Sequence, residues 1–296
     1  MDDDLLAWLL DGDPAVRWRV LRDFTGAGEE EVARERERVA AEGWGARLLA
    51  EQRADGGWGE GDYSPKWTST TYTMLHLLWL GLPARHAAVL RGCARLWEWQ
   101  TRWRTPETCI AGMLIRLTSA FRYDAERLDG LVGHLIGEQL DDGGWNCKSR
   151  GDKSMHSSFH TSIQALEALD AYRRAGGTVE ADAAIGRGHE FFLRHRLYQS
   201  HRTGAVAIPA STKFPVFPEW HFDVLRGLEH FAHTEAPRDD RLGDAIGLVR
   251  RAQRRDRRWS TYTGYAGKQF FRLEEPGPSR LNTVRALHVL QWWEAS

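Results

Sequence analysis

The sequence has few cysteines and no long apolar run. Its three cysteines are odd in number and too few for a disulfide framework. No stretch approaches the roughly 18 consecutive apolar residues that a membrane-spanning helix needs. The net charge is −1, which gives the chain as a whole no electrostatic reason to bind nucleic acid or an anionic membrane. We therefore expect neither a transmembrane segment nor a nucleic-acid partner.

Two further features are missing. The amino terminus is acidic where a secretory signal would be basic, so a cytoplasmic location is expected. No segment shows the strict alternation of apolar and polar residues that is typical of half-buried strands. The 296 residues, of which 42% are hydrophobic, are long enough to bury a sizeable core. These observations predict an all-α protein.

Two kinds of helix alternate along the chain. One kind is amphipathic, with apolar residues at three- and four-residue spacing, and is predicted at residues 30–51, 85–99, 125–139, 181–196 and 239–253. The other kind is apolar nearly all round and is predicted at residues 71–82, 110–117, 159–169, 220–231 and 281–293. Two short helices, 5–10 and 14–24, precede them. A helix that is apolar on every side must be buried on every side, so the second kind is expected to be the inner one.

A frame of Gln-x-x-Asp-x-x-Trp occurs three times, at or near the predicted ends of outer helices. The copies are Gln52/Asp55/Trp58, Gln139/Asp142/Trp145 and Gln253/Asp256/Trp259. Glycine in the first two copies suits a left-handed turn after a helix, and Gln and Trp are expected to staple adjacent helices. A spaced repeat predicts an array of similar units.

Outer and inner helices alternating six times would close into an (α/α)6 toroid, a double ring of helical hairpins formed by residues 1–296 as one domain. All inner helices would then run parallel. Their amino termini would meet at one rim, where backbone N–H groups and helix dipoles favour an anion such as a diphosphate.

The repeated frame resembles the QW repeat of squalene cyclases, and the same toroid occurs in protein prenyltransferase β subunits. The segment 143–159 is similar to the prenyltransferase segment that carries two zinc ligands, which fall here on Ser154 and His156. The third ligand position of that family falls on His221. The resemblance implies an all-α, terpenoid cyclase/prenyltransferase-like fold, an isoprenoid substrate and a zinc ion. The Asp-x-Asp-Asp motif of protonating cyclases is missing from the predicted inner helices.

Serine is a poor zinc ligand, so other nearby side chains are needed to complete such a site. The candidate metal ligands are Cys147, His156, His160, His221 and Asp223. Without a metal, His160, His221 and Asp223 are candidates for acid–base catalysis. The alternative is that the histidines and Asp223 only cap helices or satisfy the core, and that Cys147 is a small buried side chain.

Only five lysines occur among the forty Lys and Arg residues, and all lie in segments leading into predicted inner helices. With nearby arginines they could form an anion-binding ring. The candidate substrate-binding residues are Lys148, Arg150, Lys153, Lys213 and Arg280, together with Trp67 and Trp220 at the starts of inner helices.

We therefore expect an enzyme that handles an isoprenoid-like apolar small molecule. The apolar body would lie in a Trp-lined central cavity and the anionic head at a basic rim. The alternative is a non-catalytic binding or scaffold toroid that has lost the chemistry of the family. A weaker option, glycoside hydrolysis, needs two carboxylates at the mouth, and only Asp223 is an evident candidate.

Overall fold

Helices form nearly all of the regular structure. A computed structural model describes residues 2–102, 106–147, 156–262 and 264–295, and the protein is all-α over this part of the chain. The sole sheet found in these residues is a short antiparallel pair, β1 (Trp259–Ser260) and β2 (Pro278–Ser279). No helix in the described ranges combines the length and the apolar character needed to cross a bilayer.

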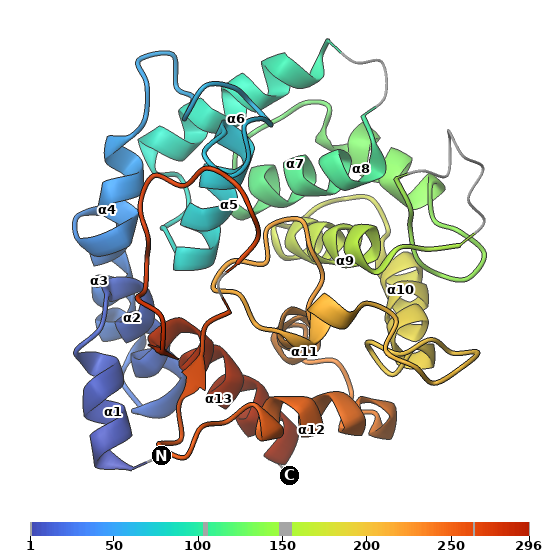
Figure 1. Cartoon of the computed structure of the whole chain (residues 1–296). Coiled ribbons are helices and arrows are strands. Elements are labelled where there is room, and N and C mark those ends of the chain that lie inside the picture. Colours follow the sequence, from blue (N-terminus) through green and yellow to red (C-terminus); the bar gives the residue numbers. More distant parts are fainter. Residues whose placement is uncertain (1, 103–105, 148–155, 263, 296) are drawn as a thin grey trace.

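The helices fall into a more central and a more peripheral set (Figure 1). The central helices are α2 (Pro14–Phe24), α5 (Thr70–Leu80), α7 (Thr108–Ala120), α9 (Phe159–Arg174), α11 (Val224–His233) and α13 (Arg280–Glu294). The peripheral helices are α1 (Asp3–Leu10), α3 (Glu29–Glu37), α4 (Gly43–Ala50), α6 (Ala87–Gln100), α8 (Leu128–Gly137), α10 (Asp182–Arg194) and α12 (Gly243–Arg251). Short 3-10 helices are η1 (Arg38–Ala40), η2 (Pro209–Thr212) and η3 (Asp240–Leu242).

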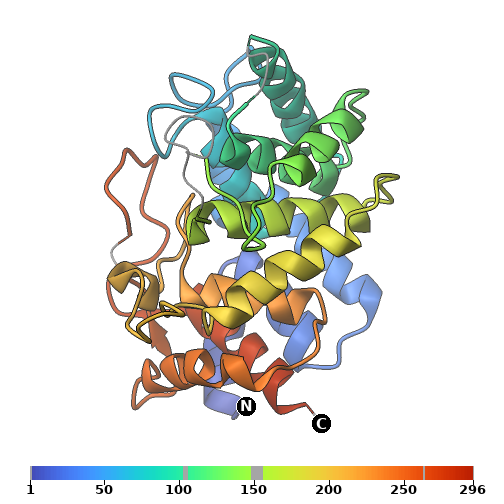
Figure 2. The same cartoon turned by 90° about the vertical axis from the view of Figure 1, so that its right-hand side faces the viewer.

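Burial separates the two sets as the apolar pattern predicts. Nine of the eleven residues of α5 and ten of the thirteen of α7 are buried, whereas α3 has no buried residue. The closest pair is α7 and α9, where a side chain at Gly112 would come within 3.1 Å of the Gln164 carbonyl oxygen. The last helix, α13, packs against both α11 and α2, so the two ends of the chain meet (Figures 1 and 2).

The tryptophans of all three Gln-x-x-Asp-x-x-Trp copies make the same hydrogen bonds, and the glutamines of the first two copies also reach the next outer helix. In the second copy, Gln139 Nε2 donates to the carbonyl oxygens of Gly143 and Ala184 at 2.7 and 2.9 Å, which joins the end of α8 to the start of α10. The Trp145 indole donates to the Leu135 carbonyl at 2.8 Å, and its backbone N–H to Ser162 Oγ at 2.9 Å. Gly143 has a φ of +95°, as a left-handed turn requires. The predicted stapling role of this frame is confirmed.

Most predicted helices differ from the observed ones at their ends, and two of the differences change the path of the chain. The helix predicted at 30–51 is divided into α3, η1 and α4, because the chain turns at Gly43, whose φ is +64°. The carboxylate of Asp13 then accepts the backbone N–H of Trp44 at 2.7 Å and fixes the start of α4. The helix predicted at 220–231 begins only at Val224, so His221 lies in the turn before α11 and not inside it.

Candidate functional site

A cavity of about 460 Å³ lies among the central helices. Its walls come mainly from the carboxyl-terminal halves of α5, α7 and α9, from α2 and α11, and from the first half of α13. The segment Val216–Pro218 contributes to the lining at one place. The long connection between α10 and α11 therefore reaches the cavity with these residues.

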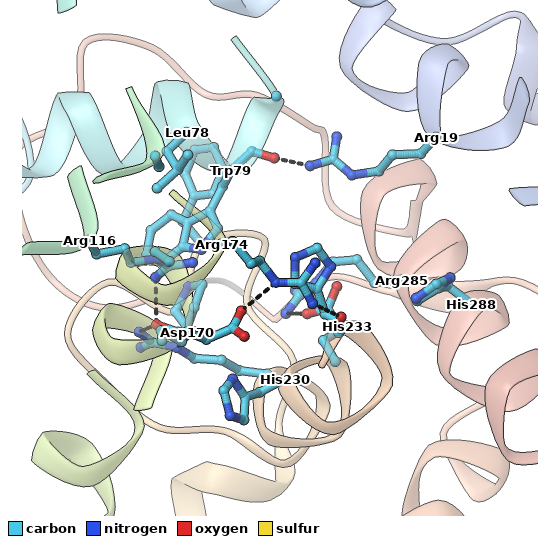
Figure 3. Close-up of a pocket in the computed structure, with 18 of the residues that line it drawn as sticks. Arg19, Leu78, Trp79, Arg116, Asp170, Arg174, His230, His233, Arg285 and His288 are labelled. Atoms are coloured by element: carbon cyan, nitrogen blue, oxygen red, sulfur yellow. Dashed lines mark hydrogen bonds and ion pairs between the residues drawn. The ribbon is translucent and has the colours of Figure 1, made fainter. Parts of the chain in front are cut away.

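Positive side chains dominate the cavity wall. The lining includes eight arginines, Arg19, Arg22, Arg36, Arg116, Arg122, Arg174, Arg226 and Arg285. The lining carboxylates are Glu167, Asp170 and Glu229. Figure 3 shows Arg19, Arg116, Arg174 and Arg285 reaching toward the same space from four different helices. An excess of guanidinium groups around a shared void favours an anionic ligand.

Glu167 is a carboxylate of the wall that pairs with two arginines. Arg226 binds it through two guanidinium nitrogens and Arg116 through a third contact. Burial raises the pKa of Glu167, but Arg116 and Arg226 outweigh that effect and hold the pKa at about 2. Glu167 is therefore ionised at neutral pH, which makes it a structural anion and a poor proton donor.

Arg19 and Arg36 bind backbone carbonyls instead of carboxylates. Arg19 donates to the carbonyls of Trp79 and Leu80, and Arg36 donates to Gly81 at 2.7 Å, so both cap the carboxyl end of α5. Burial and the neighbouring Arg22 lower the pKa of Arg19 to about 9, which still leaves it charged at neutral pH. A bound anion would relieve this crowding of like charges.

Aromatic side chains supply the apolar part of the wall. The guanidinium groups of Arg19, Arg22 and Arg36 lie 4.5 to 5.2 Å from the centre of the Trp18 ring. Phe217 stacks on His76 at 4.3 Å and on Trp79 at 5.6 Å between ring centres. His76 Nε2 lies 2.9 Å from each carboxylate oxygen of Glu219, which fixes the segment that carries Phe217. The burial of Glu219 raises the pKa of its carboxyl group.

None of the site residues predicted from the sequence lines this cavity within the described part of the chain. Four of them nevertheless lie together. The His221 ring is between Trp220, at 3.7 Å, and Tyr265, at 3.4 Å, and the rings of Trp67 and His160 lie 6.0 and 5.6 Å away. We call these five residues the histidine–aromatic cluster.

Both histidines of the histidine–aromatic cluster are neutral at pH 7. Burial and then the neighbouring His160 lower the pKa of His221 to about 3, and burial lowers the pKa of His160 to about 4. His160 Nδ1 accepts the backbone N–H of Phe222 at 2.8 Å, and the buried His221 Nδ1 has no hydrogen-bond partner in the described residues. The cluster joins the cavity through Arg226, which donates to the His221 carbonyl at 2.6 Å.

The predicted set of metal ligands is not assembled. Within the described ranges, the single group of three candidate ligand atoms within 4.8 Å of one another is Glu107, Cys109 and Cys147. Of the five predicted ligands, only Cys147 belongs to it. Asp223 is instead the N-cap of α11, where Oδ1 accepts the Arg226 backbone N–H at 2.9 Å. Of the positions that the resemblance implies, Ser154 is outside the described residues, and His156 and His221 do not belong to this group.

The structure describes two of the five basic residues that were named as candidates for substrate binding. Lys213 lies over the Tyr262 ring at 4.8 Å. Arg280 faces the first helix, where it donates to the Trp8 carbonyl at 2.8 Å and contacts Asp11. The other three basic candidates for substrate binding are outside the described residues. They are Lys148, Arg150 and Lys153.

Asp223 provides a test of the buried charge near the start of α11. Burial raises its pKa from 3.8 to about 6, and Oδ2 has no hydrogen-bond partner in the described residues. The stability that this raised pKa contributes is complete below pH 3.8 and is lost as the pH rises through 6. Asp223→Asn keeps an N-cap acceptor and removes the titration. Between pH 4 and pH 7 the wild type should lose about 2 kcal/mol of unfolding free energy through Asp223, and Asp223→Asn should not show this loss.

Urea unfolding at several pH values measures this difference. Asp182→Asn is the control, because the Asp182 side chain is 72% exposed and should leave the pH dependence of stability unchanged. Parallel pH profiles for Asp223→Asn and the wild type would show that Asp223 does not titrate in this range.

Sequence reasoning missed the arginines of the cavity, although a signal was present. Arg116, Arg226 and Arg285 interrupt helices that are otherwise apolar on every side. A charged side chain on a buried helix needs a partner or a polar void, so these three positions point to the cavity. No protein-family model matches this chain, and no curated protein sequence matches it either.

Proposed function

We propose that this protein binds an anionic small molecule with an apolar body in the arginine-lined cavity. The observation that carries the proposal is the composition of the wall, in which eight arginines face three carboxylates around a void of about 460 Å³. This volume is within the range of roughly 300–1,000 Å³ of small-molecule sites.

The chemistry of the wall favours a phosphate or carboxylate head group. Guanidinium groups bind both in a bidentate manner and stack on aromatic rings at the same time. Trp18, Trp79 and Phe217 offer aromatic surface beside the arginines. The resemblance to terpenoid cyclases and prenyltransferases implies an isoprenoid ligand. An isoprenoid diphosphate has both an anionic head and an apolar chain. In this proposal the head lies at the carboxyl ends of the central helices and not at the rim of their amino ends.

The proposal includes an (α/α)6 toroid formed by one domain. The six hairpins would be α1/α2, α4/α5, α6/α7, α8/α9, α10/α11 and α12/α13. The contact of α13 with α2 and the contacts of α5 with α7 and of α7 with α9 support a ring of central helices around the cavity. Three stapling Gln-x-x-Asp-x-x-Trp turns support the repeat.

The proposal is binding; an isoprenoid-converting enzyme would need a catalytic group other than Glu167 or Asp223, and His230, His233 and His288 are the other titratable candidates in the wall. A prenyl-transfer or cyclisation reaction needs an acid, a base or a metal ion at the bound head group. Glu167 is held ionised by two arginines and cannot donate a proton at neutral pH. Asp223, whose raised pKa would suit a general acid, does not line the cavity.

A pair of arginines on one helix tests the site. Arg36 lines the cavity, whereas Arg34, two residues away on α3, has a side chain that is 70% exposed and pairs with Glu30. We expect Arg36→Gln to weaken the binding of geranyl diphosphate by about 10-fold or more, since a hydrogen bond to a charged group contributes about 1.5–3 kcal/mol. Arg34→Gln should bind as the wild type does. Isothermal titration calorimetry measures both.

Inorganic diphosphate is the second probe in the same experiment. Tighter binding of geranyl diphosphate than of inorganic diphosphate would support a role for the aromatic wall. Equal affinities would limit the proposal to the anionic head group. If neither compound binds saturably, or if Arg34→Gln and Arg36→Gln weaken binding equally, the cavity is not the site.

A further inference from the structure

Two thiols and a carboxylate meet away from the cavity, at the amino end of α7. Glu107 is the N-cap residue of α7, Cys109 lies in the first turn, and Cys147 comes from the turn after Trp145. One ligand atom of each residue lies within 4.8 Å of those of the other two. Both cysteines are half-buried and Glu107 is exposed, so an ion can reach the group from solvent.

Contacts with residues of α7 and α9 fix the position of the Cys147 sulfur. The Cys109 backbone N–H donates to Cys147 Sγ at 3.2 Å, and Thr161 Oγ1 lies 3.4 Å from the same sulfur. The Trp145 turn holds the backbone before Cys147, because its carbonyl accepts the Ser158 backbone N–H at 2.8 Å. Cys147 therefore touches the first turns of α7 and α9, which are the two most closely packed helices of the protein.

The two sulfur side chains also contact each other, through a hydrogen bond between the thiols of Cys109 and Cys147. Glu107 accepts no N–H group of α7 in spite of its N-cap position, so its carboxylate is not used for capping.

We propose that Glu107, Cys109 and Cys147 bind a thiophilic divalent cation such as Zn²⁺, with a water molecule as the fourth ligand. Two thiolates on one tetrahedral zinc ion are about 3.8 Å apart, given Zn–S bonds of about 2.3 Å. The ligand atoms therefore need to close by at most about 1 Å. Binding replaces the thiol protons, which pass to solvent, and leaves three anionic ligands around a doubly charged ion.

This site differs from the one that the prenyltransferase resemblance of segment 143–159 implies. The implied ligands, His156 and His221, are not in the Glu107–Cys109–Cys147 group. A thiolate-rich set with an open position is typical of a zinc site. The proposal is independent of anion binding in the cavity, because the two sites share no residue.

Cobalt binding to the reduced full-length protein tests the site. Co²⁺ bound by two thiolates gives intense sulfur-to-metal charge-transfer absorption and visible bands typical of tetrahedral coordination. We expect about one equivalent of Co²⁺ to give these bands, and Zn²⁺ to displace it. The double variant Cys109→Ser/Cys147→Ser should lose the charge-transfer band. Cys93→Ser is the matched control and should retain it, because Cys93 is fully buried in the core.

Glu107→Gln should keep the charge-transfer band but bind Co²⁺ at least about 10-fold more weakly. If the double variant does not fold, alkylation of the wild-type protein tests the site instead. Zn²⁺ should protect Cys109 and Cys147 from alkylation, which mass spectrometry measures. Absence of the band in protein with three reduced thiols, persistence of the band in the folded double variant, or equal alkylation with and without Zn²⁺ would overturn the site.

Discussion

Trp145→Ala is expected to lower the free energy of unfolding by about 3–5 kcal/mol, the usual cost of removing a fully buried tryptophan. The Trp145 side chain is completely buried, and the residue lies where three helices join. Its indole donates to Leu135 on α8, its backbone N–H donates to Ser162 on α9, and a side chain at Gly188 on α10 would come within 3.0 Å of its ring. Alanine would leave a cavity where these helices join.

Trp145→Phe separates the ring from its hydrogen bond. Phenylalanine fills most of the space but leaves the Leu135 carbonyl without its indole donor, so we expect a smaller loss of about 1–3 kcal/mol. Urea unfolding followed by circular dichroism measures both variants. A Trp145→Ala protein within about 1 kcal/mol of the wild type would show that the Gln-x-x-Asp-x-x-Trp turn does not staple the helices.

The sequence predicts most of the helices because burial follows apolar periodicity. α5 and α9 are apolar on nearly every side, and both lie at the centre of the protein. The start of α11 could not be predicted in this way. Glu219 has a φ of +57° and is held there by His76, 143 residues away in the chain. A contact between such distant residues leaves no local signal, so apolar Trp220 and Phe222 were assigned to the helix.

The predicted anion site and the arginine-lined cavity lie in different places, for a physical reason. Helix amino ends attract anions directly, so the sequence predicts a ligand site there. The arginines of the cavity gather instead beside carboxyl ends, where exposed carbonyl oxygens attract cations. Arg19 and Arg36 cap the carboxyl end of α5, and the charges of these arginines then face the cavity. To predict this cavity, one would have to know that α2 and α3 place Arg19 and Arg36 at the carboxyl end of α5. The pattern of apolar residues along the sequence carries no information about that contact.

Arg226→Met is expected to lower the free energy of unfolding by about 3–5 kcal/mol, because it leaves a buried charge without its main partner. The Arg226 side chain is 2% exposed and binds both oxygens of Glu167. It also donates to the carbonyls of Glu219 and His221, so the variant would loosen the segment beside the cavity. Arg241→Met is the matched control. Arg241 is 38% exposed and pairs with Glu190, so its loss should cost less than about 1 kcal/mol.

Acid unfolding distinguishes a lost ion pair from lost packing at Arg226. The pKa of Glu167 is about 2 in the folded protein, below its usual 4.5. The stability from this shift is complete above pH 4.5 and is lost as the pH falls through 2. In Arg226→Met only Arg116 holds the carboxylate, so the pKa of Glu167 should rise and acid unfolding should begin at a higher pH. Adding Glu167→Gln should restore part of the stability, because the carboxylate that lost Arg226 is then removed as well. An acid limb identical to that of the wild type would mean that Arg226 acts through packing alone.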